Sequence, residues 1–177
     1  VSLGGDQVTN DLAQALKTST NNAEELKIGY GCVTSVFEND DVIEVPGVGD
    51  RPARSVRKKT IVQVMSDRYQ EIFTFVKEKI QQSGFEDRIP AGIVLTGGSS
   101  KTEGIEDLAE EVFHAQVRVG IPEHIYGGSE DIIKNPEYAA CVGLLIYAKE
   151  KESTKFVQSD NDFQSSIKKL LKKIFYE

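Results

Sequence analysis

The feature that most constrains the fold is a short apolar run followed by two glycines and then by helical spacing. Ile93–Leu95 is an unbroken apolar run, typical of a strand buried on both faces. Gly97 and Gly98 follow closely, and because they lack Cβ atoms another molecule can approach the backbone there. Apolar residues then recur at helical spacing over residues 105–113. The stretch predicts either a nucleotide-contacting loop or an ordinary tight strand-to-helix connection.

Length and composition narrow the class of protein. The 177 residues, 39% hydrophobic and 28% charged, predict a globular chain of one domain or two small lobes. No run of about 18 apolar residues is present that could cross a bilayer. The chain starts at Val1 without an initiator methionine, so we expect it to be part of a longer protein.

Charge and the distribution of metal-ligand residues exclude two classes of site. The net charge is −7, while the last residues are rich in lysine, so the body is acidic and nucleic acid is not the expected partner. The two cysteines and two histidines (Cys32, Cys141, His114, His124) lie outside any metal-ligand spacing. We therefore expect no metal site and two free thiols in a reducing compartment.

A second double-glycine turn opens the chain. Gly4 and Gly5 precede a helical stripe that ends at Leu16, and Asn22 is the expected cap of a second helix over residues 23–30. Glu24 and Lys27 lie three residues apart on one face of that helix, where a solvated ion pair is the plain interpretation.

The middle of the chain changes from period two to a long helix. Residues 32–37 and 42–45 have the pattern of two strands joined by a turn. The basic stretch at residues 51–59 suggests either a solvated edge strand or an anion site. Residues 61–82 have the spacing of one long helix, which Ser83 and Gly84 end.

The last third is predicted to hold one buried helix and one amphipathic segment. Asn135 and Pro136 begin a helix that is apolar nearly all round and therefore expected to be buried. Residues 149–162 are polar and have the composition of a flexible linker. Residues 163–177 place apolar side chains at helical spacing with lysines opposite, which favours a helix lying in a membrane interface. A partner-binding helix and a helix docked on its own domain are the alternatives. The membrane-facing set is Phe163, Ile167, Leu170, Leu171, Ile174 and Phe175, with Lys168, Lys169, Lys172 and Lys173.

Taken together, these segments resemble the C-terminal half of the FtsA family of bacterial cell-division proteins, within the actin-like ATPase superfamily. The resemblance covers nearly the whole chain. It is carried by residues 4–11, 23–27, 51–55, 67–69, 91–98, 112–118 and 135–147 and by the amphipathic end. It implies an α/β fold, the second lobe of the actin-like (ribonuclease H-like) fold with a mixed α+β outer subdomain. It also implies subdomains at residues 1–88 and 89–150, a linker at 151–162 and a membrane-targeting helix at 163–177.

The resemblance further implies an ATP site, with magnesium contacts lying outside this chain. Gly97, Gly98 and Ser99 match the loop beneath the adenosine, Glu24 and Lys27 the helix that approaches the ribose and base, and Gly4 and Gly5 a position next to a phosphate hairpin. The metal-orienting carboxylates and the other phosphate loops of the first lobe are absent, so we expect half a nucleotide site, no catalytic residue and no hydrolysis by this chain alone.

The implied role is that of an adaptor that polymerises like actin and ties FtsZ to the cytoplasmic face of the bacterial inner membrane at the division site. Its implied partners are the FtsZ C-terminal tail, other copies of itself, anionic lipids and other division proteins. Arg68, Lys77 and Lys79 are the candidate partner-binding cations. Two alternatives remain within the superfamily: the C-terminal lobe of a small-molecule kinase, and a pilus-assembly type of scaffold.

Overall fold

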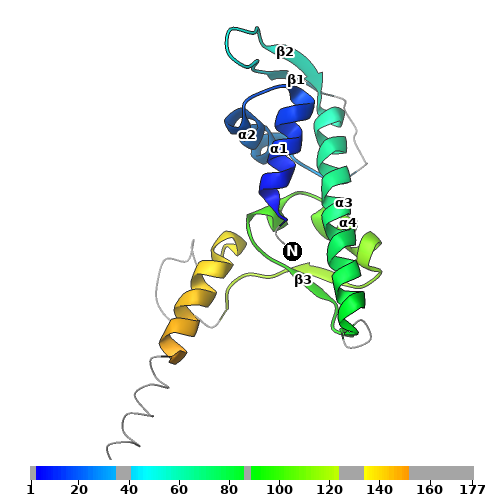
Figure 1. Ribbon diagram of the computed structural model, residues 1–177, viewed down its shortest axis with the longest axis vertical. Coiled ribbons are helices and arrows are strands. Elements are labelled where there is room, and N and C mark those ends of the chain that lie inside the picture. Colours follow the sequence, from blue (N-terminus) through cyan, green and yellow to red (C-terminus); the bar gives the residue numbers. More distant parts are fainter. Residues whose placement is uncertain (1–2, 35–40, 86–88, 124–133, 152–177) are drawn as a thin grey trace, which may run out of the picture. The chain divides into compact units, whose positions relative to one another are not determined.

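The computed structural model describes residues 3–34, 41–85, 89–123 and 134–151, which fall into two compact units, Val1–Ile121 and Pro122–Glu177 (Figure 1). Each unit is described by itself. Residues 152–162 of the predicted linker and the whole amphipathic segment at residues 163–177 lie outside the described residues.

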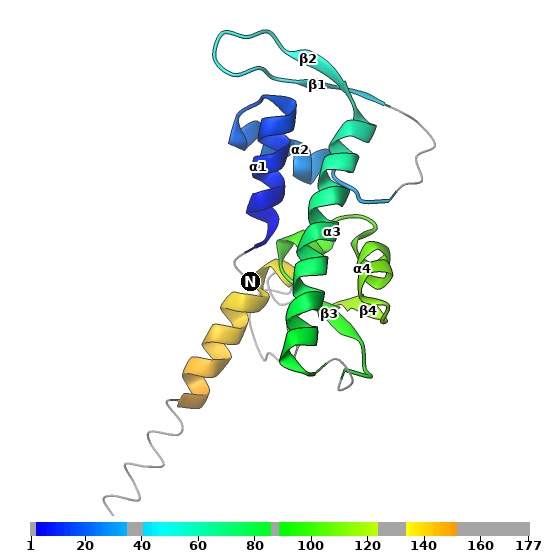
Figure 2. The same ribbon diagram turned by 45° about the vertical axis from the view of Figure 1, so that its right-hand side comes forward.

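Helices α1 (Gly5–Leu16), α2 (Thr20–Tyr30) and α3 (Lys58–Ser83) pack against one another in the first unit (Figure 2). Helix α1, Gly5–Leu16, buries a stripe of side chains that includes Val8, Thr9 and Leu12, and it packs against both α2 and α3. Helix α2, Thr20–Tyr30, begins earlier than the sequence predicts, because Ser19 rather than Asn22 is its cap: the backbone N–H of Asn22 donates to Ser19 Oγ at 3.2 Å.

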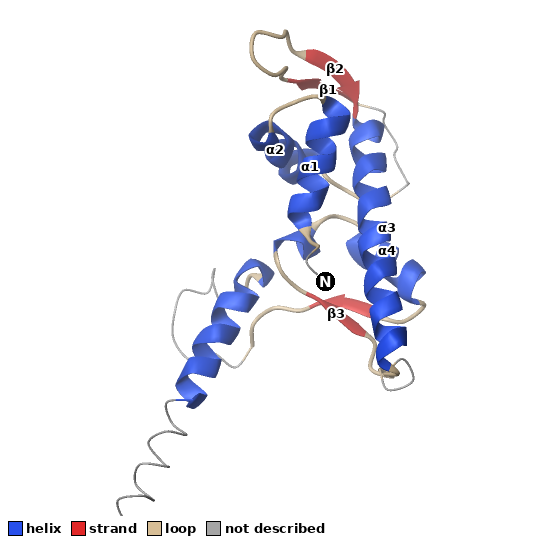
Figure 3. Ribbon diagram, viewed as in Figure 1, coloured by secondary structure: helices blue, strands red, loops and turns tan. Residues whose placement is uncertain are grey.

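Helix α3, Lys58–Ser83, is the longest element of the first unit (Figure 3). It starts directly after a strand and ends at Gly84, whose φ of +70° is the left-handed conformation expected of a glycine C-cap. One side of α3 packs against α1 and α2 and, farther along, against α4, Ile105–Phe113. These contacts build a core that includes Leu12, Leu16, Ile61, Met65, Phe73 and Ile105.

Two small sheets complete this unit. Strands β1 (Val42–Val45) and β2 (Arg54–Arg57) pair antiparallel, with Val42 opposite Arg57. Strands β3 (Ile93–Leu95) and β4 (Val117–Val119) pair in parallel, with Ile93 opposite Val117, and α4 connects them. The unit therefore contains a strand–helix–strand connection between two parallel strands.

Two expectations about the strands are wrong. Residues 32–34 do not pair with β1: Cys32 forms an isolated bridge with Glu103, and β1 instead pairs with the basic strand β2. A period-two pattern fixes which residues share a face but does not select the partner strand. Strand β3 is not buried on both faces, since Val94 is 51% exposed and the sheet's other face alone meets the core.

The second unit contains the helix that the sequence predicts after Asn135. Pro136–Tyr138 forms a short 3₁₀ turn capped by Asn135, and residues 139–151 continue as a helix. Within its own unit this helix is not covered: Leu144 and Leu145 are 68% and 73% exposed. Its burial remains a prediction. The described residues of this unit consist of little beyond this helix and its first turn, so they supply no surface that could cover it.

Candidate functional site

The glycine turn after β3 is the first part of the candidate site. Gly97 has φ +94°, a conformation that side chains rarely adopt, and no atom lies within 4 Å of the position its Cβ would take. A 3₁₀ turn, Gly98–Lys101, follows. Ser100 fixes it, because its backbone N–H and its hydroxyl both donate to Gly97 O, at 3.1 and 2.7 Å. The turn is therefore a shaped loop with an open backbone.

The N-terminus of α1 meets this loop. A Cβ added at Gly5 would lie 2.6 Å from Ser99 Oγ and 3.4 Å from Lys27 Nζ. This one position therefore brings together the starts of α1 and of the glycine turn and a side chain of α2. Gly4 precedes the helix in an extended conformation, and its N–H donates to Gln7 Oε1 at 2.7 Å. The first amides of α1 give this end a partial positive charge, which suits an anionic ligand.

Helix α2 contributes an ion pair whose lysine is mostly covered and whose carboxylate is exposed. Lys27 Nζ lies 2.6 Å from Glu24 Oε2, and the Lys27 side chain is 12% exposed against 43% for Glu24. Lys27 also donates to Thr9 Oγ1 at 2.8 Å and to Gly5 O at 3.3 Å. The plain interpretation of a solvated pair is therefore wrong: the pair is tied into α1 at the glycine turn.

The charge state of Glu24 follows from these contacts. Burial by itself would raise the pKa of Glu24, but the hydrogen bonds from Lys27 and Thr9, together with the charge of Lys27, outweigh it and lower that pKa below its ordinary value of 4.5. Glu24 is therefore an ionised acceptor at neutral pH.

A small hollow of about 100 Å³ lies beside the same turn. Its walls combine the glycine backbone with apolar side chains of α3 and α4, namely Gly4, Gly5, Ser99, Ser100, Tyr69, Phe73 and Ile105. Of the seven residues that the sequence assigns to nucleotide binding, Gly4, Gly5 and Ser99 line this hollow. The other four do not line it; they lie in the glycine turn and on α2, the two segments that reach Gly5 through Ser99 and Lys27. Their role in binding remains a prediction.

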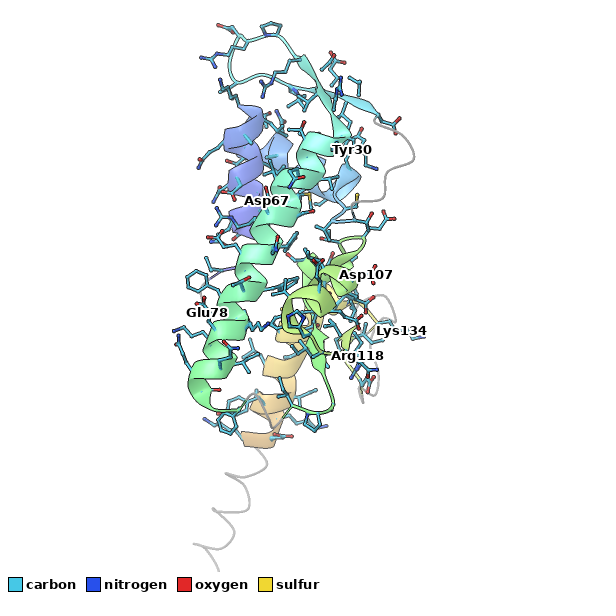
Figure 4. All side chains as sticks on the ribbon, turned by 90° about the vertical axis from the view of Figure 1, so that its right-hand side faces the viewer. Tyr30, Asp67, Glu78, Asp107, Arg118 and Lys134 are labelled. Atoms are coloured by element: carbon cyan, nitrogen blue, oxygen red, sulfur yellow. The ribbon has the colours of Figure 1, made fainter. Side chains whose placement is uncertain are left out.

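The three candidate partner-binding cations do not form one cluster of hydrogen bonds. Arg68 Nε donates to Asp11 Oδ2 of α1, and its Nη1 donates to Glu71 Oε2 at 2.6 Å. Lys77 Nζ donates to Val112 O at the end of α4, at 2.8 Å, while Lys79 donates to Gln82. The side of α3 next to Arg68 is acidic: a shallow hollow of about 380 Å³ is lined by Asp67, Gln70, Glu71, Thr74, Phe75 and Glu78 (Figure 4).

Sequence reasoning missed two residues that hold this region together. Thr9 hydrogen-bonds with both members of the Glu24–Lys27 pair, and Asp11 pairs with Arg68. In the sequence, Thr9 and Asp11 stand next to Val8 and Leu12, which belong to the buried stripe of α1. This position indicates that their polar side chains have hydrogen-bond partners within the fold. Among the described residues, no group of three or more His, Cys, Asp or Glu side chains could hold a metal ion, and no helix is long and apolar enough to cross a membrane.

Comparison with known proteins gives consistent matches. The family model described as "Cell division protein FtsA" matches residues 1–143. The FtsA of Pseudomonas aeruginosa is 49% identical over 154 residues, covering 86% of this chain and 37% of that protein. The FtsA of Escherichia coli K12 is 37% identical over 178 residues, covering 96% of this chain and 42% of that protein. The chain therefore spans about two fifths of the length of these relatives.

Solved structures match in fold. MreB5 of Spiroplasma citri bound to ADP superposes with a TM-score of 0.64 at 14% identity, covering 87% of this chain and 46% of that chain. The same protein bound to AMPPNP gives a TM-score of 0.63 at 15% identity, covering 90% of this chain and 47% of that one. At this identity the likeness concerns the fold alone, and it confirms the expected actin-like lobe.

Proposed function

The chain belongs to the FtsA family of cell division proteins, and from this premise we propose that it forms one wall of an ATP site in a cell-division adaptor. In this proposal the adaptor links FtsZ to the membrane at the division site, and residues 163–177 supply the membrane contact. Cell division itself is the role that the relatives carry in their names.

One observation carries the nucleotide part of the proposal: the convergence of Gly5, Lys27 and Ser99, which a single added Cβ would disturb. Three segments far apart in the sequence meet there with open backbone, a helix N-terminus and an ionised carboxylate. Solved MreB5 structures of the same fold hold ADP and AMPPNP, which supports an adenine nucleotide as the ligand class.

The described residues fit such a ligand. The amides at the start of α1 suit a phosphate, and Gly97 lets the ligand approach the backbone of the turn. Glu24 suits the ribose hydroxyls, because an ionised carboxylate only accepts hydrogen bonds. A bound ATP would supply the γ-phosphate, and the residues of this chain would bind and orient the nucleotide. In this proposal any magnesium ligands lie outside the residues of this chain.

The nucleotide part is tested by titrating the chain with MgATP and following binding by calorimetry. Gly5→Val should weaken binding, since its side chain would displace Ser99 and Lys27. Gly29→Ala is the matched control, because no atom lies within 4 Å of that added Cβ on α2. Equal affinities of Gly5→Val and the parent chain would refute the assignment of the site.

The membrane part is tested by sedimentation with vesicles containing anionic lipid. Leu171→Glu places a charge in the apolar stripe and should release the chain into the supernatant. Ser165→Glu adds the same charge on the opposite side of the predicted helix and should reduce sedimentation much less. Identical behaviour of the two variants, or unchanged sedimentation without residues 163–177, would contradict membrane binding through this segment.

A further inference from the structure

Thr9 is a buried polar residue with a place in the candidate site that no sequence motif assigns to it. Its side chain lies on α1, one helical turn after Gly5, and the residue is 3% exposed. The Thr9 hydroxyl accepts from Lys27 Nζ at 2.8 Å and is within donating distance of Glu24 Oε2 and of Gly5 O. A buried hydroxyl with this many partners fixes the groups around it.

The protons of Lys27 are all accounted for within the protein. An ammonium group has three N–H donors, and three acceptors lie around Nζ: Gly5 O at 3.3 Å, Thr9 Oγ1 at 2.8 Å and Glu24 Oε2 at 2.6 Å. A ligand could therefore accept a hydrogen bond from Lys27 only if one of these three bonds broke. Lys27 is a support of the site in this arrangement, not its ligand-facing group.

Glu24 is the member of the cluster that faces outward. Its side chain is 43% exposed, and its partners within the described residues, Lys27 and Thr9, both contact Oε2. The second oxygen, Oε1, is left for a donor outside the cluster. Glu24 Oε2 is held by Thr9 of α1 and by Lys27 of its own helix α2. The direction of Oε1 is therefore fixed before a ligand binds.

We propose that Thr9 is a positioning residue that, with Lys27, holds Glu24 so that its free carboxylate oxygen accepts hydrogen bonds from a vicinal diol, the ribose of the nucleotide. This inference rests on the proposed function for the identity of the ligand. The geometry of Thr9, Lys27 and Glu24 stands without it.

The test compares three variants in the whole chain. Thr9→Val keeps the shape of the side chain and removes the hydroxyl, and Thr9→Ser restores a hydroxyl. Thr74→Val is the control, because the Thr74 hydroxyl donates to Gln70 O of its own helix on the exposed side of α3, away from the Glu24–Lys27 pair. Two quantities are measured: the pKa of the Glu24 carboxyl by NMR titration, and the affinity for MgATP. Circular dichroism establishes that each variant is folded.

Thr9→Val should raise the pKa of Glu24 toward its ordinary value and weaken MgATP binding about tenfold, the effect of losing one hydrogen bond to a charged group. Thr9→Ser should restore both, and Thr74→Val should change neither. An unchanged Glu24 pKa in Thr9→Val, or an MgATP affinity equal to that of the parent chain, would overturn the positioning role. If the parent chain itself does not bind MgATP, the proposed function fails, while the pKa series alone then decides whether Thr9 orients Glu24.

Discussion

The ion pair between Arg68 and Asp11 gives a prediction that separates structural from partner-binding roles of α3. Arg68 on α3 reaches across to Asp11 on α1, and both side chains are largely covered, at 28% and 27% exposure. Its second bond, to Glu71, stays within α3. The hydrogen bond to Asp11 raises the pKa of Arg68 despite partial burial, and the charges of Asp11 and Glu71 act in the same direction. We perturb this pair with Arg68→Ala, Asp11→Ala and the double variant.

The size of the effect follows from the exposure of the two groups. Exposed ion pairs contribute about 0.2–1 kcal/mol, and this pair belongs at the upper end because water screens it less than a fully exposed pair. We therefore expect a coupling of about 1 kcal/mol. Each single substitution should cost somewhat more than that, because it also leaves a partly covered charge without its partner.

Urea unfolding of the four proteins measures this coupling as the difference between the double variant and the sum of the singles. A coupling indistinguishable from zero would refute the inference that Arg68 clamps α3 to α1. The same pair makes a binding prediction that rests on the proposed partner. If Arg68 binds a carboxylate of the FtsZ tail peptide, Asp11→Asn should tighten that peptide's binding, since the peptide no longer competes with Asp11. Unchanged peptide affinity in Asp11→Asn would exclude such competition.

Three further predictions follow from single positions. Gly31→Ala should destabilise the chain by about 2–3 kcal/mol in urea unfolding, because the added Cβ would lie 2.6 Å from Met65 Cε and closer still to the carbonyl oxygen of Lys27. An unchanged midpoint of urea unfolding would contradict the packing at the end of α2. Gly97→Ala should cost about 1–2 kcal/mol by the same measurement, through its φ of +94° alone, since the added Cβ meets no atom. Because the pKa of Glu24 is lowered, the contribution of its carboxylate to stability is present above pH 4.5 and is lost as pH falls through the folded-state pKa. Glu24→Gln should therefore reduce the loss of unfolding free energy that the parent chain shows below pH 4.5. The same loss in the variant and in the parent chain would show that Glu24 is not tied to Lys27 and Thr9.

Local patterns in the sequence were enough for most elements. The glycine turn between β3 and α4, the buried stripe of α1 and the end of α3 at Ser83 all lie where residue spacing and turn chemistry place them. Each of these features depends on neighbours within a few residues. The partner of β1 depends on a contact with the distant strand β2, and periodicity carries no information about it.

The site was predictable as a set of segments but not as a network. The glycines and the Glu24–Lys27 pair could be assigned through a family resemblance, and the structure brings them to one place. The links through Thr9 and Asp11 could not be assigned, because a threonine and an aspartate on a helix give no signal of which distant side chain they bond. The surface that would cover the apolar helix at residues 139–151 could not be predicted for a related reason: an apolar face indicates that a cover is needed but does not identify it.

The most direct test of the account is an NMR titration of the isotope-labelled chain with MgATP. We predict that the amides of Gly4, Gly5, Glu24, Lys27 and Gly97–Ser99 shift together along one binding curve, because these residues converge on one site. Shifts confined to other regions of the chain, or an unchanged spectrum at saturating nucleotide, would contradict a nucleotide site at this glycine turn.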